Sequence, residues 1–178
     1  GKIAAIVVTS FLIVITVIVT EARFADFGLT LAQADGSIQP ALFATAFTLL
    51  FMMLIVRLVK RKPKADRESI TYQATIPSID EELYYRGLLL FTMSLALIEP
   101  ESSPVAHPSA WSAILVTLLF GLVHSLMVND SKIQFDLAAL ILVRILGSIF
   151  MWIRLTTGSI FIPLIAHNLT NITSNTAP

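Results

Sequence analysis

The chain has 178 residues, of which 56% are hydrophobic and only 13% are charged. Soluble domains carry about 25% charged residues, so this composition excludes an ordinary soluble protein and predicts an integral membrane protein. The formal net charge is zero, which gives no indication of a nucleic-acid partner. The sequence has no cysteine, which excludes disulfides, thiolate metal ligands and a cysteine nucleophile.

Two long apolar runs, Ile3–Thr20 and Gly36–Val56, contain no charged residue, and each approaches the roughly 20 residues that a membrane-spanning helix needs. The first run has no Ala-x-Ala-like cleavage site, so we predict a retained helix and not a signal peptide. Four further helices are expected at about Leu83–Ile98, Trp111–Val128, Phe135–Arg154 and Ser159–Ile172. We therefore predict an all-α fold, a single membrane-embedded bundle of about six spans over residues 1–178, with two of them within residues 1–59.

A basic segment follows the second run. Its lysines and arginines are Arg57, Lys60, Arg61, Lys62, Lys64 and Arg67. The later loop Glu99–Ala110 contains none, so the positive-inside rule predicts that the basic segment is cytoplasmic. With six spans, both ends of the sequence would then be cytoplasmic.

The stretch Ser78–Phe91 places three consecutive acidic residues before an apolar run. Ser78 and Glu81 have the spacing of a capping box, which predicts a helix that starts here. In such a helix Glu82 and Arg86 lie one turn apart and can pair, whereas Glu81 points about 100° away. One carboxylate would then be neutralised and the other left available for chemistry.

Two further polar pairs lie near the ends of expected helices. Phe120 and His124 are one turn apart in the fourth helix, and His167 and Asn171 are one turn apart in the sixth. A histidine at a helix end is often structural, but polar side chains in an apolar helix are costly unless they are paired or line a wet cavity.

The expected topology brings these motifs together. The third helix begins on the side of the membrane where the fourth and sixth helices end, whichever way the protein is oriented. We therefore expect one polar site at a similar depth, built from Glu81, Glu82, Arg86, His124, His167 and Asn171.

The three motifs also carry a family resemblance. "EELYYR" fits Glu-Glu-x-x-x-Arg, "FGLVH" fits Phe-x-x-x-His and "HNLTN" fits His-x-x-x-Asn, in that order. The chain resembles the CPBP family of intramembrane proteases, which comprises CAAX proteases and bacteriocin-processing enzymes and is also called the Abi family. The resemblance covers a core at about residues 76–173.

The resemblance implies peptide-bond hydrolysis within the membrane, near the cytoplasmic face of a prokaryotic plasma membrane. The substrate would be a membrane-associated peptide or a lipidated protein. Glu81 would be the general base that activates water, assisted by His124, while His167 and Asn171 would stabilise the oxyanion. The supporting residues would be Glu82, Arg86 and Phe120.

Three alternatives stay open. Glu81, His124 and His167 form a credible ligand set for Zn²⁺, but the sequence has no His-Glu-x-x-His motif, so we favour hydrolysis without a metal or other cofactor. A non-proteolytic membrane adaptor or bacteriocin-immunity protein on the same scaffold is the second alternative. A small transporter is the third, although the internal repeat common in transporters is missing.

Other polar residues receive structural interpretations. Arg144 lies in the middle of the fifth helix, where we expect it to pair with a carboxylate inside the bundle. His107 is expected in a loop on the side opposite the site. Trp111 and Trp152 lie near helix ends and are typical of interfacial anchors.

Overall fold

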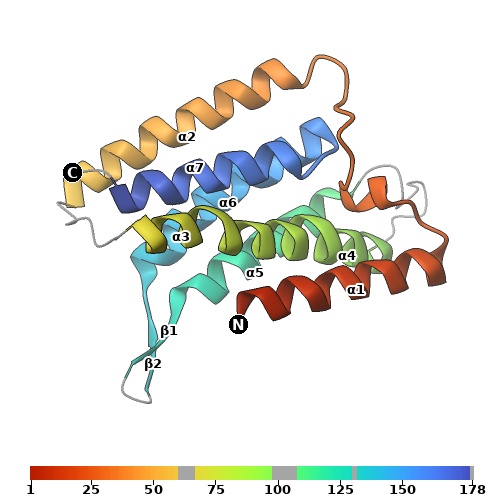
Figure 1. The fold of residues 1–178 in the computed structure, drawn as a ribbon, viewed down its shortest axis with the longest axis horizontal. Coiled ribbons are helices and arrows are strands. Elements are labelled where there is room, and N and C mark those ends of the chain that lie inside the picture. The colour runs from red at the N-terminus through yellow and green to blue at the C-terminus, as the bar shows by residue number, and fades with distance from the viewer. Residues whose placement is uncertain (60–66, 98–107, 130–131, 177–178) are drawn as a thin grey trace.

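The computed structural model describes residues 1–59, 67–97, 108–129 and 132–176. His107, which is expected in a loop, lies outside the described residues. Among the described residues the fold is an all-α bundle with one short hairpin (Figure 1), so the predicted fold class is confirmed. Three helices are long and apolar enough to cross a membrane, namely α1 (Lys2–Thr20), α2 (Ile38–Val59) and α6 (Leu137–Thr157). The total of six spans stays a prediction.

The N-terminal helices α1 and α2 correspond to the two charge-free runs. Residues such as Ile3, Val7 and Phe11 of α1 are exposed, as expected for side chains that face lipid. A short 3₁₀ turn, η1 (Phe24–Phe27), follows α1 and buries Phe27 in the core.

The third helical segment starts much earlier than the expected Leu83. It consists of α3 (Arg67–Glu81), the π-helix η2 (Glu82–Leu89) and α4 (Leu90–Ala96), which continue one another. Polar composition made the beginning of this segment resemble a loop, but α3 is a helix that packs against α1 and α7. Ser78 and Glu81 therefore lie at the end of a helix and not at its start, so the predicted capping box was wrong.

The fourth helix ends earlier than expected. Helix α5 (Ala110–Ser125) is followed by the antiparallel strands β1 (Leu126–Asn129) and β2 (Lys132–Phe135). The apolar residues up to Val128 had been assigned to the helix because a short apolar run does not distinguish helix from strand.

The C-terminal half is completed by α6 and α7 (Phe161–Thr176). Helix α6 begins where the Asp136 side chain accepts a hydrogen bond from the Ala139 amide at 2.9 Å. It ends at Gly158, whose φ of 75° gives the left-handed conformation favoured at helix C-caps.

The segment α3–η2–α4 runs through the middle of the bundle (Figure 1). It has α7 on one side and α1 on the other, while α5 packs against α6 and α2 against α7. Tyr85 and Leu90 pack with Val116, Phe120 and Met151 in one apolar cluster that joins η2, α4, α5 and α6. The central segment is thus enclosed at the level of η2.

Arg144 corrects another expectation. Its side chain is exposed, and no described residue forms an ion pair or a hydrogen bond with it. Its aliphatic stem lies over Gly121, where a Cβ atom would come within 2.4 Å of Arg144 Cγ. The predicted carboxylate partner inside the bundle was therefore wrong among the described residues, because the stem packs on the outer face of α5.

Candidate active site

The central acids lie at the junction between α3 and η2. Pro77 is inside α3, where it cannot donate a backbone hydrogen bond, and the chain then changes from α- to π-helical geometry at Glu82. π-Helical turns inside α-helices are frequent at functional sites. At this junction Glu81 and Glu82 face different partners.

Glu82 is completely buried and lies in a network with Arg86 and His167. Its Oε1 atom is 3.1 Å from Arg86 Nη1 and 2.8 Å from His167 Nδ1. Arg86 also donates to the Gly147 carbonyl at 3.3 Å, and its Cζ atom lies 4.2 Å from the centroid of the Phe120 ring. Glu82 and Arg86 therefore form the ion pair that their spacing predicted.

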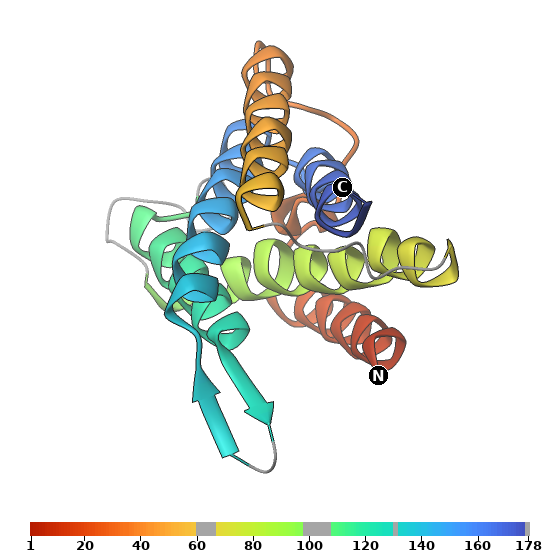
Figure 2. The same ribbon diagram turned by 90° about the vertical axis from the view of Figure 1, so that its left-hand side faces the viewer.

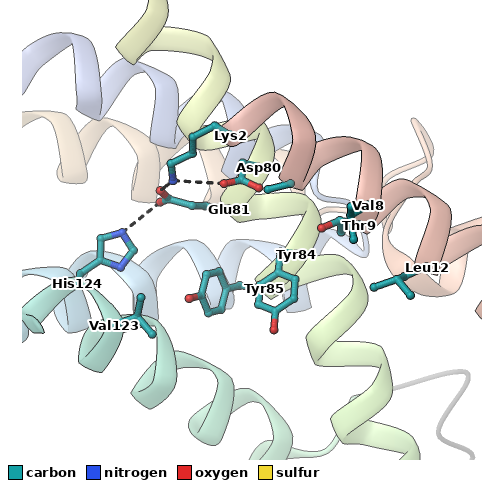
Figure 3. Close-up of a pocket in the computed structure, with 11 residues that line it drawn as sticks. Lys2, Val8, Thr9, Leu12, Asp80, Glu81, Tyr84, Tyr85, Val123 and His124 are labelled. Carbon is teal, nitrogen blue, oxygen red and sulfur yellow. Dashed lines mark hydrogen bonds and ion pairs between the residues drawn. The ribbon is translucent and has the colours of Figure 1, made fainter.

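Glu81 faces the two histidines and a lysine. Its Oε2 atom is 3.4 Å from His124 Nε2 and 3.7 Å from His167 Nε2. Its Oε1 atom accepts a hydrogen bond from Lys2 Nζ at 2.7 Å, and the same ammonium lies 3.3 Å from Asp80 (Figure 3). The structure thus brings together Glu81, His124 and His167, which are far apart in the sequence.

The partners of the two histidines define which ring nitrogens carry hydrogen. His124 Nδ1 lies 2.8 Å from the Phe120 carbonyl, and His167 Nδ1 lies 2.8 Å from the Glu82 carboxylate. Both partners only accept, so both Nδ1 atoms must donate. The Nε2 atoms are the ones that remain for chemistry at Glu81.

Asn171 approaches the same place from α7. Its Nδ2 atom donates to Ser78 Oγ at 3.0 Å, so Ser78 holds this amide. A cavity of about 240 Å³ lies between α3, α5, α6 and α7. Its polar lining consists of Glu81, His124, His167, Thr170 and Asn171.

A second cavity, of about 450 Å³, lies on the other side of Glu81 and His124, between α1, the α3–η2 junction and α5 (Figure 3). Its remaining lining is largely apolar and includes Leu12, Tyr85 and Val123. Glu81 and His124 thus line both cavities.

The donor types of Glu81, His124 and His167 suit zinc. Among the described residues, however, no group of three or more His, Asp or Glu side chains is arranged as a metal site. We therefore derive no step of the reaction through a metal.

Two contacts of the site were missed from the sequence. Lys2 contacts Glu81, but nothing in the spacing of these two residues indicates it. No sequence pattern marks Gly147, yet a Cβ atom there would lie 2.9 Å from Phe120 Cδ1. Only a glycine allows α6 to approach the Phe120 ring and the Arg86 guanidinium so closely.

The fold and this site define a class of protein, a helical membrane protein with a buried polar site of two glutamates, two histidines, an arginine and an asparagine. The model of the family described as "Type II CAAX prenyl endopeptidase Rce1-like" matches residues 69–173, more than half of the chain. The chain belongs to this family, and the resemblance to the CPBP and CAAX proteases is confirmed. Family membership makes the protein a membrane protease, that is, a peptide hydrolase. No curated protein and no solved structure matches the chain.

Proposed function

We propose that the protein is an intramembrane endopeptidase that hydrolyses a peptide bond of a membrane-associated peptide or protein through a water activated by Glu81. The observation that carries this proposal is the convergence of His124 Nε2 and His167 Nε2 on one oxygen of Glu81, at 3.4 and 3.7 Å. Three acceptor-capable atoms that face one another require protons between them. A water molecule supplies two O–H groups in this position.

In the proposed reaction, Glu81 accepts a proton from the water while the water oxygen attacks the carbonyl carbon of the substrate. His124 Nε2 accepts a hydrogen bond from the second O–H group of the water and so directs the lone pair of the water toward the carbonyl carbon. Its ring is held for this by the Phe120 carbonyl and by the Phe120 ring, whose centroid lies 4.4 Å away. The carbonyl π bond opens, and its electron pair becomes the oxyanion of a tetrahedral intermediate.

The oxyanion is stabilised by donors on α7 in this proposal. Asn171 presents its amide from a position held by Ser78, and His167 lies beside it on α7 with its ring held by Glu82. When the intermediate collapses, the C–N bond breaks and the proton on Glu81 passes to the leaving amine. In a site of low dielectric, fixed donors of this kind typically raise the rate by roughly 10²–10³-fold.

We further propose that the whole described chain acts as one membrane-embedded unit, with the site near the cytoplasmic face of a prokaryotic plasma membrane. Lys2 marks the charged end of the α1 span and contacts Glu81, which supports a site close to a membrane surface. The basic residues that follow α2 support the cytoplasmic side.

The test is proteolysis by the purified full chain in detergent or liposomes. The substrates are a fluorogenic farnesylated CAAX peptide and a set of unmodified transmembrane peptides. We expect cleavage by the wild type, a loss of at least about 10²-fold in Glu81→Gln, and no loss in the matched control Glu21→Gln, whose glutamate is exposed beyond the other end of α1. Cleavage should survive a strong metal chelator.

Unchanged cleavage in Glu81→Gln would contradict the role of this residue. Chelator-sensitive cleavage that zinc restores would contradict the metal-free reaction. Failure of the folded wild type to cleave any of these substrates would count against proteolysis and favour the non-proteolytic alternative.

A further inference from the structure

The hairpin β1–β2 projects from the bundle beside the candidate active site (Figures 1 and 2). Strand β1 begins at Leu126, which only Ser125 separates from His124. Several hairpin side chains are apolar but exposed, with Leu126 at 46% and Ile133 at 76%. Within the described residues, the sheet contains these two strands and no third.

The register of the hairpin shows which backbone groups are free. The pairs run from Leu126 with Phe135 to Asn129 with Lys132, and the Asp136 amide donates to the Ser125 carbonyl at 2.8 Å. Hydrogen-bonded and non-hydrogen-bonded pairs alternate in an antiparallel ladder, so Val128 and Ile133 form a non-hydrogen-bonded pair. The N–H and C=O groups of Val128 therefore point away from β2, along the outer edge of β1.

This outer edge faces the site. Figure 2 places β1 on the side of β2 that is nearer the N-terminal end of α1, where Lys2 meets Glu81. The apolar cavity of about 450 Å³ opens in the same region, lined by Lys2, Val123 and His124. Val123 and His124, which line this cavity, lie at the end of α5 immediately before Ser125 and β1, so the strand starts next to the catalytic candidates.

A peptide bond cannot be hydrolysed while it remains inside a transmembrane helix, because neighbouring turns cover its carbonyl and bind its oxygen. The segment around that bond must first unfold to an extended form. In an apolar environment each unpaired N–H and C=O group is costly, so the enzyme must supply partners. A free strand edge supplies both kinds of partner at the required spacing.

We propose that the outer edge of β1 binds the unfolded backbone of the substrate as a third strand and leads its scissile bond to Glu81. This inference rests on the proposed function and names how that site takes its substrate. A second copy of the chain fits the observations less well, because β1 starts only two residues after His124, which contacts Glu81 and lines the apolar cavity.

The first test removes one outward N–H group. Val128→Pro deletes the donor on the outer edge of β1 without deleting a hairpin hydrogen bond, and Ile133→Pro makes the matched change on the outer edge of β2. For a transmembrane peptide that the wild type cleaves, we expect kcat/KM to fall roughly tenfold in Val128→Pro, mostly through KM, and to stay within about twofold in Ile133→Pro. Equal effects of the two variants would overturn the proposal.

The second test does not depend on a proline being tolerated. Because the chain has no cysteine, Leu126→Cys and Phe135→Cys each introduce a unique thiol at paired positions of the two strands. In the Glu81→Gln background, a substrate with one cysteine near its scissile bond should form a disulfide with position 126 and not with position 135. Cross-linking at position 135 alone, or between two copies of the enzyme and not to the substrate, would overturn the proposal.

The two proposals fail separately. The proposed function is contradicted if the wild type cleaves nothing or if the Glu81→Gln variant still cleaves. Failure of the strand-edge proposal appears as normal wild-type cleavage with no difference between Val128→Pro and Ile133→Pro.

Discussion

The buried pair of Glu82 and Arg86 makes a quantitative prediction about stability. Arg86 is 1% exposed and Glu82 is fully buried, with 3.1 Å between Nη1 and Oε1. Arg86→Met keeps most of the side-chain volume but leaves a buried carboxylate without its arginine. Breaking a buried pair in this way costs about 3–5 kcal/mol. We expect a value near the lower end, about 3 kcal/mol, because His167 still contacts the same oxygen.

The assay is reversible unfolding of the purified protein in mixed micelles, titrated with SDS and followed by circular dichroism. Glu82→Gln and the double variant complete a double-mutant cycle. The double variant should lose about 2 kcal/mol less unfolding free energy than the sum of the losses in the two single variants, because it removes both charges together. Arg23→Met is the matched control, since Arg23 pairs with Asp26 at 2.9 Å but its side chain is 75% exposed. It should leave the unfolding curve unchanged.

A loss below about 1 kcal/mol in Arg86→Met, or strict additivity in the cycle, would refute the reasoning. Either result would mean that the stability of the buried carboxylate does not depend on the arginine.

Three further predictions concern the surroundings of the site. Gly147→Ala should destabilise the protein by about 1–3 kcal/mol in the same SDS titration, because its Cβ atom would lie 2.9 Å from Phe120 Cδ1; an unchanged curve would show that the ring moves freely. Asn171→Ala should lower kcat by roughly 10²-fold, and Ser78→Ala by a smaller factor because Ser78 only holds the amide; the opposite order of kcat values would contradict these roles. Arg144→Met should leave kcat/KM within about twofold, since no described residue pairs with this guanidinium and methionine keeps the stem that packs on α5; a larger loss would reveal a role in turnover.

The sequence was sufficient to predict how the main residues meet. Composition predicted the membrane bundle, and the number of helices between the motifs predicted that Glu81, His124 and His167 would share one depth. These residues meet although Glu81 lies inside the continuous segment α3–η2–α4 and not at a helix start, because this segment packs against both α5 and α7. The ion pair of Glu82 and Arg86 followed from helical spacing alone.

Other features depend on contacts between distant elements and could not be predicted. The polar sequence of α3 resembles a loop until α1 and α7 are present beside it. The π-helix at Glu82 changes the hydrogen-bonding pattern without a residue type that marks it. The strand β1 resembles a helix end because its apolar residues continue the run of α5.

The contact between Lys2 and Glu81 has a consequence for how the protein can be divided. The family match begins at residue 69, yet the closest cation to the proposed general base is contributed by α1, far outside that match. A shortened protein that keeps only the matched residues would retain each motif but lose the wall of the larger cavity and the counter-charge of Glu81. The part of the sequence that the family model matches is therefore smaller than the unit that encloses the candidate site, and α1 belongs to that unit.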